Sequence, residues 1–421
     1  MYTNILFGIV TVTFLFSFGC VHRGSEKDSR FSRQPENWLS EAIKSVPRDY
    51  GNAALGFTNY HKARIIANAE DYNGMSTIMA EGADAVPWTY DLLSGEPFAN
   101  GASTDIIFQE TGFDFFALDQ QIWQHRLADA EQEIGPRFGI AVGSFGSESA
   151  AQSLAEWLLE LSLHHDTYNG VTYYYSWDNK PPGPREMLSN PFRMDAANHL
   201  NALAFVGDTL LVRKWPRAMP DQIDVHMGKR PSLWDDSGHR ELAWAVGDEI
   251  LTGVFLNPEF VAWGWSDSGY KRDEDPDRFS DYANSWGKLD PYSVAVIGSD
   301  IRGETAYTVV ALRYSDPEAA GRNAEELKRR WNSAYLRIDS SGGSSMGQTP
   351  DVFEPCAKIC APLDTRSVVY DKSSVLAASC PATGFISDVH GATGPTLWRG
   401  LVERHELHFL VPDIAELTGG Q

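Results

Sequence analysis

Cys20 is the residue whose surroundings point most directly to a chemical modification. It follows an apolar run, residues 5–18, that is shorter than the roughly 20 apolar residues a bilayer-spanning helix needs and suits a signal peptide. Ser17 and Gly19 supply small residues of the kind that precede the acylated cysteine of a bacterial lipoprotein. We therefore predict cleavage before Cys20 and lipidation of its thiol. An ordinary secretory signal or an uncleaved N-terminal anchor is the alternative.

The other three cysteines cluster near the C-terminus, at Cys356, Cys360 and Cys380. An exported protein lies in a compartment that permits disulfides. A bridge between Cys356 and Cys360 would constrain little, because they stand one helical turn apart, so we predict that Cys380 pairs with one of the two. The paired short spacings of zinc modules are absent around these cysteines, and we predict no metal site.

The sequence contains a motif typical of hydrolases, but its surroundings argue against that chemistry. Residues 343–347, GSSMG, match a nucleophile elbow centred on Ser345. The elbow needs a helix after the serine, whereas QTPDVFEPC follows here, so a flexible linker is the better interpretation. The acidic run around residues 273–284 lacks the glycine and final glutamate of a calcium loop. We assign no catalytic residue and no cofactor.

Aromatic residues near an acidic loop form the candidate binding surface. Trp263, Trp265 and Tyr270 stand beside that loop, and Trp286 follows it. Flat aromatic faces stack on sugars and attract cations, and the surrounding aspartates disfavour anions. We predict an exposed surface for an uncharged or cationic partner, such as a protein or a carbohydrate. Packing of these side chains in the core is the alternative.

The charge balance excludes one broad class of partner. The chain has 35 Lys and Arg residues against 57 Asp and Glu residues, which gives a net charge of −22. Nucleic-acid binding depends on cationic side chains that displace counterions from phosphates. We therefore expect no nucleic-acid partner.

The elements that must position these residues alternate between hairpins and amphipathic helices. Three hairpins are predicted. One turns at Gly207, one turns at Asp371, and one lies within residues 293–314. A helix is expected from Asp316 to Trp331, with Pro317 in its first turn. This pattern predicts an α+β fold of mainly antiparallel sheets with helices packed on one face.

The expected organisation along the chain follows from composition and from two breaks between elements, an acidic loop and a Ser/Gly-rich segment. The predicted parts are a signal peptide (1–19), a polar tether (20–37), an α+β body (38–338) with a possible break near 266–291, a Ser/Gly-rich linker (339–352) and a C-terminal cysteine-containing segment (353–421).

Several blocks together resemble uncharacterised bacterial extracytoplasmic lipoproteins, some of them grouped as domains of unknown function. The blocks are SVPRDYGNAALGFTNYHKAR, TGFDFFALDQ, RFGIAVGSF through YNGVTYYY, and FVGDTLLV with PSLWDD, and the resemblance covers residues 38–335. It implies location and fold class, and it carries over no site residue. We expect an exported protein, attached to a cell-envelope membrane by an N-terminal lipid, with a binding or scaffolding role. The alternative is an extracytoplasmic hydrolase whose site is assembled from residues distant in sequence.

Overall fold

The fold is known from a computed structural model of the chain. The described residues are 37–66, 118–124, 140–144, 152–153, 155–156, 164–175, 202–213, 215–267, 284–303, 305–338, 352–381, 398, 401–402 and 407–413. All of them belong to one compact unit, Glu36–Gln421. Cys20, residues 20–36 of the tether, Ser345 and Tyr270 lie outside the described residues, so the predictions made for them stay predictions.

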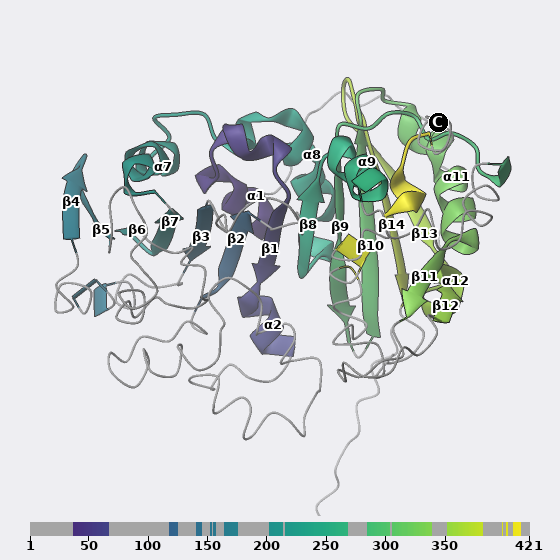
Figure 1. The fold of residues 1–421 in the computed structure, drawn as a ribbon, viewed down its shortest axis with the longest axis horizontal. Coiled ribbons are helices and arrows are strands. Elements are labelled where there is room, and N and C mark those ends of the chain that lie inside the picture. The colour runs from purple at the N-terminus through teal and green to yellow at the C-terminus, as the bar shows by residue number, and fades with distance from the viewer. Residues whose placement is uncertain are drawn as a thin grey trace, which may run out of the picture. The chain divides into compact units, whose positions relative to one another are not determined.

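A twelve-stranded sheet, antiparallel at every pairing, forms the centre of the unit (Figure 1). Its spatial order is β13-β14-β10-β9-β8-β1-β2-β3-β7-β6-β5-β4. The strands are β1 (Leu55–Asn59), β2 (Gln120–Gln124), β3 (Ile140–Ser144), β4 (His164–Tyr168), β5 (Val171–Tyr175), β6 (Ala202–Val206), β7 (Thr209–Arg213), β8 (Thr252–Leu256), β9 (Val294–Arg302), β10 (Thr305–Tyr314), β13 (Asp364–Val369) and β14 (Ser374–Pro381). The predicted α+β class and the three predicted hairpins, β6–β7, β9–β10 and β13–β14, are confirmed.

Helices connect and cover these strands. The described α-helices are α1 (Trp38–Ala42), α2 (Tyr60–Ile66), α7 (Met219–His226), α8 (Ser237–Val246), α9 (Pro258–Asp267), α11 (Ala319–Ser333) and α12 (Cys356–Ile359). Short 3₁₀ helices include η1 (Ile43–Ser45), η6 (Leu233–Asp235) and η9 (His408–Leu410). A separate two-stranded sheet pairs β11 (Tyr335–Ile338) with β12 (Val352–Pro355).

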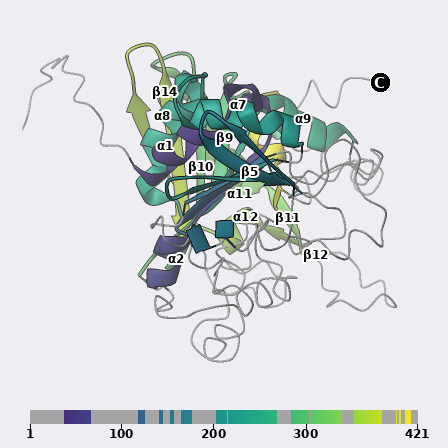
Figure 2. The ribbon, with the colours of Figure 1, turned by 90° about the vertical axis from the view of Figure 1, so that its left-hand side faces the viewer.

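The helices lie on both faces of the sheet, which corrects the prediction of a single covered face. In β10, Val309 packs in the same core cluster as residues of α8, whereas Val310 packs with residues of α11. Alternate residues of a strand point to opposite faces, so α8 and α11 cover opposite sides. Figure 2 shows α8 and α9 on either side of β9. A continuous apolar run such as VVAL, residues 309–312, is typical of a strand buried on both faces.

The C-terminal segment completes the sheet. β14 pairs with β10 on one side and with β13 on the other, so residues beyond the expected linker belong to the same core as the body. Cys360 and Cys380 form a disulfide, which is one of the two pairings that the sequence left open. Cys356 is buried nearby and lies outside this bridge.

A row of uncharged polar side chains crosses the sheet in register. Gln121, Thr58, Thr252, Ser299 and Thr308 stand opposite one another on five adjacent strands, and all five are buried. The hydroxyls of Thr58 and Thr252 are 2.8 Å apart and bond to each other. The hydroxyls of Ser299 and Thr308 have no hydrogen-bond partner in the part of the chain that the structure describes. A buried hydroxyl without a partner costs stability.

Thr308→Val is therefore expected to raise the free energy of unfolding by about 1 kcal/mol, because valine has the same shape and no group to desolvate. The matched control is Thr58→Val, which removes the bond to Thr252 and is expected to lower that free energy by about 1 kcal/mol. Urea unfolding of both variants measures the difference. A loss of stability in Thr308→Val would show that the hydroxyl has a partner, such as a buried water molecule.

Candidate functional site

An open pocket of about 420 Å³ lies on the face of the sheet that carries α1 and α7. Three strands, β2, β3 and β7, form one wall, and α1, η1 and the end of α7 form the other. Ile122 and Val142 belong to the core cluster on this face and supply an apolar floor. The remaining lining side chains are mostly polar, and they come from segments far apart in the sequence.

The strand wall presents three polar side chains in register. Gln120 stands opposite Ser144, and Ser144 stands opposite Thr209. Each is two positions from an apolar residue of the pocket face, so the alternation of a strand directs all three side chains to that face. Thr209 also donates a hydrogen bond to Asp208 at 3.2 Å. The wall therefore offers an amide and two hydroxyls at the spacing of neighbouring strands.

The helical wall carries a serine and a histidine in contact. The Ser45 hydroxyl oxygen lies 2.8 Å from Nδ1 of His226, and the two residues are separated by 181 positions in the sequence. Gln222 of α7 donates to the Ser45 carbonyl, which ties η1 to α7. Burial lowers the pKa of the His226 imidazole, and the carboxylate of Asp208 opposes that shift. The ring is therefore neutral at pH 7 and can exchange hydrogen bonds with an uncharged ligand.

Charged side chains stand at the edge of the pocket. Glu41 and Lys44 form an ion pair of 2.8 Å, and both side chains are at least one-third exposed. The Lys44 ammonium also lies 5.1 Å from the centre of the Trp234 ring. Asp208 is exposed at the turn between β6 and β7. Because Glu41 and Lys44 offset each other, the net charge that the described residues place at the edge is the carboxylate of Asp208.

Trp286 is buried, which corrects its place in the predicted exposed surface. Its Nε1 donates to the Ser333 hydroxyl at 2.7 Å, and its ring stacks on His408 with centroids 5.8 Å apart. The Arg330 guanidinium lies 5.4 Å from the ring centre. These contacts come from α11 and η9, so the burial of Trp286 depends on segments remote in sequence.

The exposure of the other three residues of that predicted surface is not tested by the described residues. Trp263 and Trp265 lie in α9, a helix that the sequence analysis did not assign, and their side chains are outside the described set. Tyr270 is outside it altogether. An aromatic surface made by these three residues remains a prediction.

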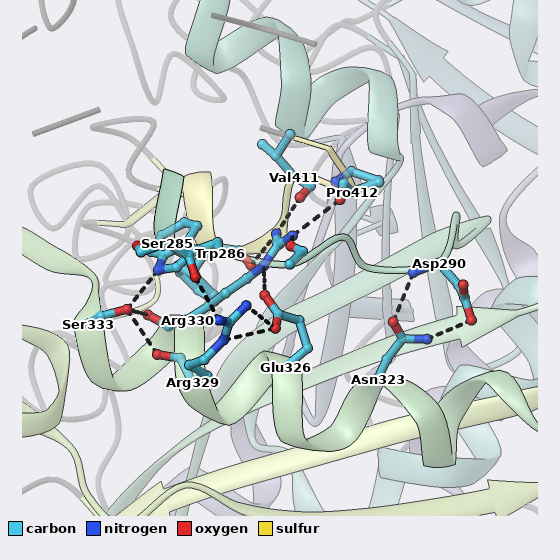
Figure 3. A network of polar contacts seen from close by, with 12 residues as sticks. Ser285, Trp286, Asp290, Asn323, Glu326, Arg329, Arg330, Ser333, Val411 and Pro412 are labelled. Atoms are coloured by element: carbon cyan, nitrogen blue, oxygen red, sulfur yellow. Dashed lines mark hydrogen bonds and ion pairs between the residues drawn. The ribbon is translucent and has the colours of Figure 1, made fainter. Parts of the chain in front are cut away.

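Arg330 is the centre of the network drawn in Figure 3. Its side chain is fully buried and donates to Glu326 at 3.0 Å, to the carbonyl of Phe409 at 3.4 Å and to the carbonyl of Pro412 at 3.2 Å. It also donates to the carbonyls of Gly287 and Val411. The donors of this buried cation are thus used to hold chain segments together, which is a structural role.

Two negative findings concern only the described residues. Among them, no cluster of three His, Cys, Asp or Glu side chains is arranged to hold a metal ion. None of their helices combines the length and the apolar character required to cross a bilayer.

Comparison with known proteins gives no relative from which a site can be transferred. No protein-family model, no curated protein and no solved structure matches the chain. The pocket must therefore be interpreted from its own residues. No short motif links Ser45, Asp208 and His226, so the sequence carries no signal that marks them as a site.

Proposed function

We propose that the chain is an exported cell-envelope protein that binds a small, uncharged molecule rich in hydroxyl or amide groups. The pocket described above is the proposed binding site, and a carbohydrate is the class of ligand that fits its chemistry best. The observation that carries this proposal is the row Gln120, Ser144 and Thr209 facing Ser45 and His226 across one pocket.

The charges around the pocket support a neutral ligand. An anion would meet Asp208 at the edge and the long-range field of a chain with net charge −22. Each described hydrogen-bonding group on the strand wall is neutral, and so is His226 at pH 7. Small-molecule sites typically combine an apolar surface with a few placed polar groups, as Ile122 and Val142 do with this row.

Thr209→Val tests the site, because it removes one pocket hydroxyl and keeps the shape of a residue that is 8% exposed. We expect affinity to fall about tenfold, which corresponds to about 1.4 kcal/mol for one hydrogen bond. The measurement is isothermal titration calorimetry of the full chain with neutral monosaccharides and disaccharides as probes. Thr167→Val, on exposed strand β4, is the matched control and should bind as the wild type does. Failure of every probe to bind, or equal affinity of wild type and Thr209→Val, would contradict the proposal.

The membrane attachment is a separate part of the proposal, supported by the short apolar run that ends before Cys20. Cys20→Ala is expected to move the protein from the detergent phase to the aqueous phase in detergent partitioning, because a lipid on the thiol is the proposed anchor. Intact mass of the wild type should show the added lipid. Unchanged partitioning of Cys20→Ala would refute lipid attachment at this residue and would leave the pocket untouched.

A further inference from the structure

The direction of the hydrogen bond between Ser45 and His226 depends on the tautomer of the imidazole. Among the described residues, Nδ1 of His226 is the only hydrogen-bond partner of the Ser45 hydroxyl, at 2.8 Å. If Nδ1 carried the proton and donated, the hydroxyl hydrogen of a buried serine would lack a described acceptor. With the ring proton on Nε2, Ser45 donates to Nδ1 and its hydroxyl has an acceptor among the described residues. Nδ1 is then an acceptor directed at a serine hydroxyl.

We propose that Ser45 is an acyl-accepting nucleophile and His226 its general base, so that the pocket hydrolyses an ester of a neutral, hydroxylated molecule. This inference rests on the proposed ligand site and adds a reaction to it. The geometry meets the first requirement for such a pair, because nucleophile and base are within hydrogen-bond reach and both line one pocket. Burial keeps the imidazole unprotonated at neutral pH, which is the state a general base needs.

The reaction balances with water as the only co-reactant. The Ser45 oxygen attacks the ester carbonyl carbon, a C–O bond forms, and the hydroxyl proton passes to Nδ1 of His226. The bond from that carbon to the alcohol oxygen then breaks, and the departing alcohol takes the proton from Nδ1. Water attacks the acyl carbon of the resulting acyl-serine and gives a proton to Nδ1, and the bond from that carbon to the Ser45 oxygen breaks, which releases the carboxylic acid. The proton returns from Nδ1 to the Ser45 oxygen.

The pocket supplies groups to position such a substrate. Gln120 lines the wall opposite Ser45 and carries an amide donor for the carbonyl oxygen. Lys44 precedes Ser45 in the chain and lines the same pocket, and its ammonium is paired with Glu41. Asp208 stands on the same side of the sheet as His226 and acts on its imidazole electrostatically, favouring the cation that forms when Nδ1 takes a proton. Ser144 and Thr209 remain available to the hydroxyls of the substrate.

A fluorophosphonate tests the nucleophile in the full-length chain, because it phosphonylates serines that are activated by a base. We expect one label on the wild type, located on Ser45 by peptide mass mapping. Ser45→Ala should lose the label, and His226→Asn should slow labelling about 100-fold or more, the range expected for loss of a general base. Ser367→Ala, an exposed serine on β13, is the matched control and should label like the wild type. The labelling rate should also rise with pH, with its midpoint below the usual histidine pKa of about 6.5, because burial lowers the pKa of His226.

Two results would overturn the inference: no label on Ser45 of the wild type, or undiminished labelling of His226→Asn. Because the wild type supplies the first result, misfolding of a variant cannot hide it. Hydrolysis of 4-nitrophenyl acetate should follow the same order among the variants, and equal rates in wild type and Ser45→Ala would count against it. Saccharide binding measured by calorimetry separates the proposed binding site from the proposed hydrolysis. If the wild type binds a saccharide but takes no label, the binding site stands and the hydrolysis is refuted.

Discussion

Replacing Arg330 with methionine is expected to lower the free energy of unfolding by about 3 to 5 kcal/mol, the range found when one partner of a buried charged network is removed. Arg330 is 0% exposed and donates to carbonyls in two segments that α11 holds, residues 287 and 409–412. Methionine fills similar space but leaves those carbonyls without this donor. It also removes the cation from the face of the Trp286 ring.

The neighbouring residue Arg329 provides the control for charge and for helix propensity. Its side chain is 50% exposed, and it bonds Glu326 on the same helix and the Ser285 carbonyl. Arg329→Met is expected to cost less than about 1 kcal/mol, because exposed ion pairs contribute little. Urea unfolding of the two variants, followed by tryptophan fluorescence, makes the comparison. Equal losses in both would contradict a specific role for Arg330.

Breaking the disulfide with Cys360→Ala is expected to lower the free energy of unfolding by about 3 kcal/mol. The bridge closes a loop with a sequence separation of 20, and the chain-entropy relation for a loop of that length gives this value. Cys356→Ala is the matched control, because Cys356 is also 0% exposed but lies outside the bridge. Its expected loss is about 1 kcal/mol, from the removal of a buried sulfur.

Thermal or urea unfolding under non-reducing conditions measures both cysteine variants. Dithiothreitol should lower the stability of the wild type toward that of Cys360→Ala and leave the variant unchanged. If Cys356→Ala loses as much as Cys360→Ala, the bridge contributes nothing beyond packing. Non-reducing peptide mapping of the wild type should recover Cys360 joined to Cys380.

Local signals in the sequence were sufficient for much of the sheet. The hairpin at Gly207 could be predicted because glycine readily adopts the positive φ that a tight turn requires. In the structure its φ is 61°. The same kind of signal was present at Asn169 and Gly170, both at positive φ, and it marks the β4–β5 hairpin that the sequence analysis did not assign. The helix expected from Asp316 begins at Ala319, and Asp316 instead accepts a hydrogen bond from the Glu318 backbone just before it.

The candidate site could not be predicted in the same way. Ser45 and His226 meet only because η1 and α7 pack over strands that come from three separate regions of the chain. Neither residue lies in a short motif, so the sequence offered no signal for the pair. Trp286 shows the opposite error: an acidic loop nearby suggested exposure, but Arg330 and His408 bury its ring. Burial of a side chain depends on its tertiary partners.

The strand order has a consequence for how the chain folds. β1 lies between β2 and β8, and β10 lies between β9 and β14, so early strands pair with strands that are made much later. Arg330 finds its last carbonyl partners at residues 409–412, close to the C-terminus. Non-local pairing of this kind slows folding, because the chain loses the entropy of closing long loops before the stabilising contacts between distant strands form. A nascent chain that lacks its final segment therefore cannot complete this core, and the last contacts of Arg330 form only after residues 409–412 have been made.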